Sequence, residues 1–243
     1  MAGPICKARR EEAQPAPMPA VRDPVQTQRR ILRAARNEFM HHGYSGARIE
    51  RISRAARSSD RMIYYYFASK EALYLQVLEG VYSELGEAEG ALTLDPSRPV
   101  EALDQLIAFT WRYYVEHPEF VALLSNENLQ RGRHITKSVK VKLLSRPVLD
   151  ILGTILAEGA RQKVFRRDLD VKKVYLTLAA LGYFYLSNRY TLSSFLGVDL
   201  MRPAECDAWL TEIRRVVLSA VGVPAANSLE AKELKAVHGG IRR

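Results

Sequence analysis

The chain has 243 residues, of which 47% are hydrophobic and 26% charged, a composition typical of a globular protein with a sizeable core. No apolar run approaches the roughly 18 residues of a membrane span, and the first residues lack the pattern of a secretory signal. The two cysteines, Cys6 and Cys206, support neither a disulfide framework nor a zinc site. We therefore expect a cytoplasmic protein without a metal ion or cofactor.

The net charge of +9 is concentrated near the N-terminus. Residues 22–70 carry eleven Lys or Arg and four Asp or Glu, a local net charge of +7, whereas residues 71–223 have a net charge of −1. A solvated basic face would explain this segment, and so would a surface that neutralises nucleic-acid phosphates. The order of the residues within the segment favours the second interpretation.

The chain predicts an all-α fold between two flexible ends. Residues 1–22 are rich in proline and predict a flexible arm, and the polar residues 224–243 predict a flexible tail. Between them, apolar residues recur at helical spacing and no alternating strand pattern is found. The first two helices are expected at about 25–42 and 48–56, with Gly43 ending the first.

The helices that follow have recognisable starts. Ser59 is a suitable N-cap for a third helix that ends at Phe67, and Ser69 is one for a fourth helix. After Pro99 an apolar stripe indicates another helix, and Pro118 opens the next at its first turn. The remaining helical segments are expected at 135–162, which Pro147 should kink or divide, and at 171–190 and 203–221.

Three short helices, the third entered through a tight turn, make a helix-turn-helix unit. The segment TQRRILRAARNEF at 27–39 is followed by HGY at 42–44, ISRAA at 52–56 and IYYYFASKEALY at 63–74. Together these segments resemble the signature of the TetR family of transcriptional regulators. The resemblance implies a DNA-binding domain at 23–69 and a larger helical effector-binding and dimerisation domain at 70–223.

The residues themselves agree with a recognition role for the third helix. Ile63 and Phe67 are expected to face a small core, which leaves the N-terminal side of the helix exposed to base edges and phosphates. Arg61 is suited to guanine O6 and N7, and the serine hydroxyls to phosphate. The resemblance implies that Tyr64 and Lys70 contact phosphates. The candidate DNA-binding residues are Arg48, Ser58, Ser59, Asp60, Arg61, Tyr64, Tyr65 and Lys70.

Three details of the unit leave alternatives open. Tyr66 is expected in the core, whereas Tyr65 fits either the core or the DNA face. The family usually has Gly followed by an apolar residue at the turn, where this chain has Arg57 and Ser58. If the turn has the family's conformation, Arg57 has a positive φ, which costs about 1 kcal/mol and could be compensated by an extra phosphate contact. The alternative is that the turn has a different conformation. The family also favours Thr or Ser at the start of the second helix, where Arg48 is a possible replacement.

The C-terminal half resembles the branch of the family that contains the pyrimidine-utilisation repressor, in HPEFVALLSNENLQRGRHI at 117–135 and SNRYTL at 187–192. This resemblance implies a one-component sensor, in which a small molecule changes the separation of two DNA-reading heads. An apolar cavity with a few polar groups suits such a ligand, although an aromatic stripe at helical spacing is more often plain core. The candidate effector-binding residues are Trp111, Tyr114, Asn128, Arg131, His134, Tyr183 and Phe184.

The last helices predict a homodimer. Residues 175–186 are apolar almost all round, and Trp209, Ile213 and Val217 belong to a second apolar stripe. One side of each helix would pack on its own domain and the other on a symmetry mate. We therefore expect a repressor that binds a palindromic operator as a homodimer, through the helices near 171–190 and 203–221, and that an effector releases.

Other classes of protein fit less well. An enzyme is disfavoured because the chain has no glycine-rich phosphate loop, no nucleophile elbow and no pair of metal ligands on one helix face. A ligand-independent architectural DNA-binding protein remains open, although about 150 C-terminal residues are many for dimerisation alone. A membrane-surface protein would not require the caps and spacing of a helix-turn-helix.

Overall fold

The computed structural model describes residues 23–144 and 146–222, and the predicted all-α fold is confirmed within them. The N-terminal part comprises α1 (Pro24–Gly46), α2 (Ile49–Ala55), α3 (Asp60–Phe67) and α4 (Lys70–Gly90). The C-terminal part comprises α5 (Pro99–Glu116), α6 (Pro118–Leu129), the short 3₁₀ helix η1 (Ile135–Lys137), α7 (Val139–Leu144), α8 (Arg146–Arg161), α9 (Val171–Ser187), α10 (Arg189–Leu196) and α11 (Pro203–Val221). The predicted arm at 1–22 and tail at 224–243 lie outside the described residues.

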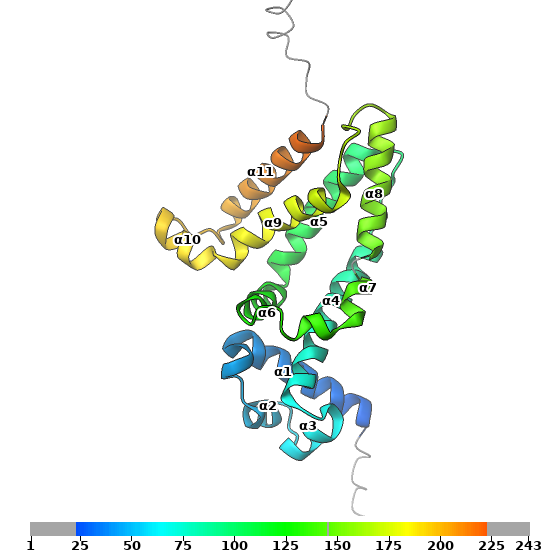
Figure 1. Cartoon of the computed structure of the whole chain (residues 1–243). Coiled ribbons are helices and arrows are strands. Elements are labelled where there is room, and N and C mark those ends of the chain that lie inside the picture. Colours follow the sequence, from blue (N-terminus) through cyan, green and yellow to red (C-terminus); the bar gives the residue numbers. More distant parts are fainter. Residues whose placement is uncertain (1–22, 145, 223–243) are drawn as a thin grey trace, which may run out of the picture.

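Helices α1, α2 and α3 form a small head at one end of the molecule (Figure 1). Ile31 and Phe39 lie on one face of α1 and meet Ile52 of α2 and Ile63 of α3, and all four side chains are fully buried. Gly43 has φ 63° and interrupts the regular helix, after which α1 continues for one turn. The predicted end of the first regular helix at this glycine is therefore confirmed.

The expected helix caps are also confirmed. The Ser59 side chain accepts a hydrogen bond from the backbone N–H of Met62 at 3.3 Å, and Ser69 accepts one from Ala72 at 3.0 Å. Each bond satisfies a backbone donor that the first turn of a helix leaves without a partner. These two caps fix where α3 and α4 begin.

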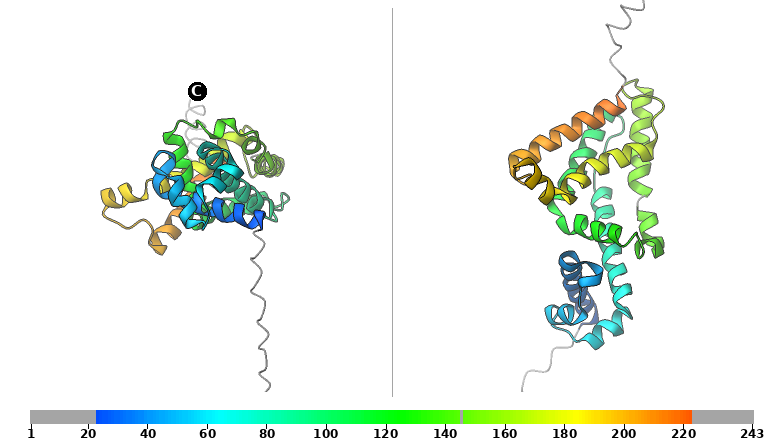
Figure 2. Two further views of the ribbon diagram at one scale, coloured as in Figure 1. Left: turned by 90° about the horizontal axis from the view of Figure 1, so that it is seen from below. Right: turned by 60° about the vertical axis from the view of Figure 1, so that its left-hand side comes forward.

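Helix α4 joins the head to the C-terminal domain. Leu73 and Tyr74 near its start are buried in the same core as Phe39, and Leu85 near its end is buried in the C-terminal core. The right-hand view of Figure 2 shows the head below the other helices, with α4 leading up from it. The core is therefore continuous along α4, from the head to the C-terminal domain.

Helix α5 is the centre of the C-terminal domain and packs against α6, α8, α9 and α11. Helix α9 approaches it closely at Gly182, where a Cβ atom would lie 3.1 Å from the Tyr114 ring. Gly159 of α8 is similarly required, because a Cβ atom there would overlap the Phe165 ring. The first approach leaves little room between α5 and α9, and the second holds the α8–α9 connection against α8.

The segment predicted at 135–162 is divided next to Pro147, as expected, and comprises η1, α7 and α8. Pro147 lies in the first turn of α8, where its missing N–H is tolerated. One later helix differs from the sequence-based expectation. The helix expected at 171–190 ends at Ser187, and a separate helix, α10, follows it. In Figure 1, α10 projects to the side of the domain beyond the end of α11.

Candidate DNA-binding and effector sites

Helix α3 presents a polar face to solvent. Ile63 and Phe67 are buried, whereas Arg61, Tyr64 and Tyr65 point outward, with Tyr64 49% and Tyr65 76% exposed. Tyr66 is partly buried and packs against the core. The exposed fraction of Tyr65 therefore favours the second of the two alternatives for this residue, a side chain on the outer face.

The turn before α3 has a left-handed residue at Arg57, with φ 50°. The backbone N–H of Ser58 donates to the carbonyl of Ser53 at 2.9 Å, which closes the turn. Ser59 then caps the helix and Asp60 occupies its first turn. Ser58, Ser59 and Asp60 therefore lie together at the N-terminal end of α3, beside Arg61.

Arg48 lies at the start of α2, next to a partly exposed ion pair. Glu38 of α1 accepts hydrogen bonds from the Arg48 backbone N–H at 3.0 Å and from Arg51 Nε at 2.7 Å. Burial opposes ionisation of Glu38, but these bonds hold its pKa below the ordinary value. Glu38 thus fixes the start of α2, and the exposed Arg48 side chain has no hydrogen-bond partner among the described residues.

Lys70 begins α4 on the same side of the head. Its ammonium nitrogen lies 4.8 Å from the centre of the Tyr44 ring, a cation–π contact. Partial burial lowers the pKa of Lys70. No carboxylate among the described residues forms an ion pair with it, so the charge is available to a phosphate.

A buried polar cluster joins the head to α6. Glu127 of α6 accepts from the backbone N–H groups of His134 at 2.7 Å and Ile135 at 2.9 Å, and its other oxygen lies 2.9 Å from His134 Nδ1. The His134 ring contacts the rings of Tyr44 of α1 and Tyr74 of α4, with centroids 4.3 and 4.9 Å apart. His134 is therefore a junction residue between the two parts of the protein.

Four of the candidate effector residues come from neighbouring helices. The Tyr183 hydroxyl lies 2.9 Å from Ser125 Oγ and accepts from Asn128 Nδ2 at 3.4 Å, which links α9 to α6. Trp111 and Tyr114 of α5 are buried beneath the same stretch of α9. Their packing is that of core residues, with the Trp111 ring against Tyr185 and the Tyr114 ring against Phe120.

The other three candidates lie apart from this group. Arg131 is exposed in the connection after α6 and has φ 57°. His134 belongs to the junction cluster already described. Phe184 is 58% exposed on the outside of α9, so it faces away from Trp111 and Tyr114. The structure therefore does not bring all seven candidates into one cavity.

Sequence reasoning missed a partly buried acidic residue of the C-terminal domain. Burial raises the pKa of Glu89, near the end of α4, to about 7. Its carboxylate is close enough to Tyr113, Tyr114 and Tyr175 to raise the pKa of each further. Glu89 has no hydrogen-bonding or ion-pair partner for its side chain among the described residues. In the sequence, Glu89 stands close to Glu87 and Gly90, as is typical of the exposed end of a helix. The sequence pattern therefore does not predict that Glu89 is partly buried.

A large apolar face is exposed on α9 and α10. Near it the Trp209 ring of α11 stacks on Tyr185, with centroids 5.0 Å apart, and donates to the Leu181 carbonyl at 3.2 Å. A groove of about 420 Å³ runs along α9, α10 and α11. The exposed apolar residues of the face are Leu176 (64%), Phe184 (58%), Tyr190 (75%), Phe195 (85%) and Leu196 (57%). Large apolar side chains gathered on two neighbouring helices at the surface indicate a site where another protein binds.

Comparisons with known proteins agree with this architecture. Residues 31–77 match the family model described as "Bacterial regulatory proteins, tetR family", and residues 99–217 match "Tetracyclin repressor-like, C-terminal domain". Within residues 23–144 and 146–222, no helix has the length and apolar character needed to cross a membrane.

Individual relatives give the same picture. The HTH-type transcriptional repressor NicS of Pseudomonas putida is 48% identical over 193 residues, which cover 79% of this chain and 91% of NicS. The HTH-type transcriptional regulator RutR of Escherichia coli is 45% identical over only 51 residues, 21% of this chain and 24% of RutR, which does not decide the branch. The crystal structure of the putative transcriptional regulator SCO4942 of Streptomyces coelicolor superposes with a TM-score of 0.60 at 25% identity, over 78% of this chain and 97% of that one. The chain therefore belongs to the TetR family of bacterial regulators.

Proposed function

We propose that this protein is a transcriptional repressor that binds a palindromic operator as a homodimer and is released by a small-molecule effector. The observation that carries the proposal is the capped helix α3, whose Arg61, Tyr64 and Tyr65 are exposed in a segment of local charge +7. The name of NicS, a transcriptional repressor, supports the sign of regulation. The chromosome as target would place the protein in the cytoplasm, and a role in regulation gives no reason to expect catalysis.

The DNA contacts follow from the exposed groups of the head, which we assign to residues 23–69. Arg61 reads guanine in the major groove, and Asp60 beside it adds a carboxylate that can accept from cytosine N4. Ser58 and Ser59 donate to phosphate. The remaining phosphate contacts are assigned to Arg48, Tyr64, Tyr65 and Lys70.

The dimer is assigned to the C-terminal domain, residues 70–223. Two copies of the exposed face on α9, α10 and α11 would cover each other across a two-fold axis, as the segments near 171–190 and 203–221 were expected to do. Helix α10 adds Tyr190, Phe195 and Leu196 to that interface. A two-fold dimer presents two equal heads and therefore selects a palindrome.

The effector is assigned to the contact region of α5, α6 and α9, where Asn128 and Tyr183 supply polar groups beside Trp111 and Tyr114, and these closely packed helices would have to separate to admit it. Glu89 is added to this group because its carboxyl has no protein partner. Arg131, His134 and Phe184 are kept as outer candidates. The junction of Glu127 and His134 would pass a shift of α6 to the head. Membership in the pyrimidine-utilisation branch is a hypothesis that effector screening addresses.

Selection of the purified full chain against random duplex DNA, at near-physiological salt, tests the proposal. Enrichment of a palindrome is the expected result, and the enriched duplex then serves as the probe for effector screening. Binding that depends on salt alone, with no enriched sequence, would refute operator recognition by the free protein.

A further inference from the structure

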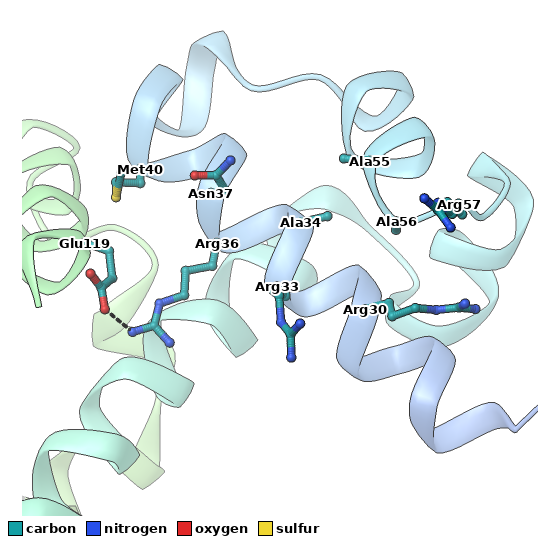
Figure 3. A pocket seen from close by; sticks show the side chains of 10 residues that line it. All are labelled: Arg30, Arg33, Ala34, Arg36, Asn37, Met40, Ala55, Ala56, Arg57 and Glu119. Carbon is teal, nitrogen blue, oxygen red and sulfur yellow. Dashed lines mark hydrogen bonds and ion pairs between the residues drawn. The ribbon is translucent and has the colours of Figure 1, made fainter.

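A basic cleft of about 660 Å³ lies on the head, away from the exposed face of α3 (Figure 3). Its walls come from α1, the C-terminal end of α2 and the start of α6. The arginines around it are Arg30, Arg33, Arg36 and Arg57, and short apolar side chains such as Ala34 and Ala55 form its floor. The volume falls in the range of small-molecule sites, roughly 300–1,000 Å³.

The charges around the cleft are not balanced. Arg36 is paired, since its guanidinium lies 2.6 Å from Glu119 and 2.7 Å from Glu84. Arg30 bonds only to the Thr27 hydroxyl, at 3.3 Å. Arg33 and Arg57 have no side-chain hydrogen bond or ion pair with any described residue. Three positively charged side chains therefore line the cleft without an ion-pair partner among the described residues.

The arginines are arranged along the cleft. Figure 3 shows Arg30 and Arg57 at the end next to the α2–α3 turn, and Arg36 with Glu119 at the opposite end. Arg57 reaches this position from a left-handed backbone, φ 50°, which costs a non-glycine residue about 1 kcal/mol. Like charges at one end repel each other unless an anion lies between them. Both the strain and the repulsion are costs that a bound anion would offset.

We propose that Arg30, Arg33 and Arg57 form a binding site for a phosphate group in this cleft, with Arg30 and Arg57 at the end beside the α2–α3 turn and Arg33 next to them along α1. A phosphate offers several oxygens in a tetrahedral arrangement, so it can accept from guanidinium groups on two different elements, whereas a planar carboxylate matches one fork. The phosphate is either a phosphodiester of DNA outside the bases that α3 reads, or part of a free small molecule. If the phosphate belongs to DNA, this inference rests on the proposed function of operator binding. If the phosphate belongs to a free small molecule, the inference does not.

The first experiment measures binding of inorganic tripolyphosphate to the full chain without DNA, by calorimetry and by the melting temperature. Saturable binding is expected, and Arg30→Ala, Arg33→Ala and Arg57→Gly should each weaken it about tenfold, the loss of one charge-assisted contact. The control is Arg167→Ala, which removes an exposed arginine of the α8–α9 connection and should change nothing. Because Arg57→Gly relieves strain, weaker binding by that variant cannot be ascribed to unfolding.

The second experiment measures the salt dependence of operator binding, with long duplexes and with duplexes trimmed to the selected bases. If DNA is the source, Arg30→Ala and Arg33→Ala should each reduce the slope of log K against log salt by about 0.9, only on the long duplex and without changing base preference. If these variants leave the salt slope of operator binding unchanged but weaken tripolyphosphate binding, the site binds a free phosphate compound and not DNA. If neither measurement separates these variants from Arg167→Ala, the site does not exist. Failure of the wild type to select any sequence would instead refute the proposed function, and the first experiment would still be decisive for the cleft.

Discussion

The two exposed faces of this protein have opposite chemistry. On α3, the outward side chains are Arg61, Tyr64 and Tyr65, which all end in polar groups and lie in a positively charged segment. On α10, the most exposed side chains include Phe195 and Tyr190, at 85% and 75%. A charged face stays hydrated and exchanges counterions for phosphates, so its contacts are reversible and sensitive to salt. An apolar face lowers its free energy only when it is covered, so its partner should stay bound.

The largest effect is expected from a charge on the apolar face. Phe195→Asp should abolish the dimer and weaken operator binding between about a hundredfold and ten-thousandfold, because two linked heads bind far more tightly than one. Sedimentation measures the mass, and a binding titration measures the affinity for the full palindrome. A single half-site should be bound about equally by the variant and the wild type. If the variant remained dimeric, α10 would lie outside the interface.

The interior of the C-terminal domain should respond to pH through Glu89. Its pKa of about 7 in the folded state lies above the ordinary value of 4.5, so the folded state holds a proton that the unfolded state releases between these two pH values. Stability should therefore fall as pH rises from about 4.5 to about 7, by up to about 3 kcal/mol, and then level off. Denaturant unfolding should show that Glu89→Gln removes this slope.

The matched control for this prediction is the neighbouring residue Glu87, which is exposed. Glu87→Gln should leave the pH dependence of unfolding as in the wild type. If the free energy of unfolding of Glu89→Gln varied with pH as that of the wild type does, the group that titrates would not be Glu89. A ligand that carries a positive charge to Glu89 should also remove the slope, which connects this measurement to the effector search.

Smaller effects should distinguish two residues within the DNA face. Arg61→Ala should cost about 1–3 kcal/mol of operator binding and relax the preference at one base pair, because a bidentate contact to guanine is lost. Lys70→Ala should weaken binding to all sequences alike and reduce the salt slope by about 0.9. Repeating the random-duplex selection with each variant separates these outcomes. Unchanged specificity in Arg61→Ala would mean that α3 lies differently in the groove.

The helices of the head were predictable from the sequence because interactions between residues close in the chain determine where they begin and end. Ser59 and Ser69 cap the helices that they were expected to cap, and Gly43 ends the first regular helix, since each acts through its own backbone neighbours. The exposure of Tyr65 was not decided, because three tyrosines in a row give no periodicity. Only the packing of Ile63 and Phe67 sets the rotation of α3.

The C-terminal domain was less predictable because its site depends on contacts between distant residues. Asn128 meets Tyr183 across 55 positions of the sequence, and the burial of Glu89 depends on helices that follow it in the chain. Phe184 shared an apolar run with Tyr183, yet the two side chains lie on different sides of α9. An aromatic residue in such a run can face the core, a ligand or a partner subunit, and periodicity alone does not separate these roles.

The smallest effect is expected at the turn between the two halves of the helix-turn-helix. Arg57→Gly should raise the free energy of unfolding by up to about 1 kcal/mol, because glycine adopts the observed φ of 50° without steric cost, although its extra freedom in the unfolded chain offsets part of this gain. Arg57→Ala keeps the strain and should leave stability nearly unchanged. Both variants remove the charge of Arg57, but only Arg57→Gly removes the backbone strain. The difference between their free energies of unfolding, measured with denaturant, therefore reports the strain. If both variants had equal stability and both bound DNA less tightly, the turn would carry no measurable strain and the side chain of Arg57 would act only through its charge.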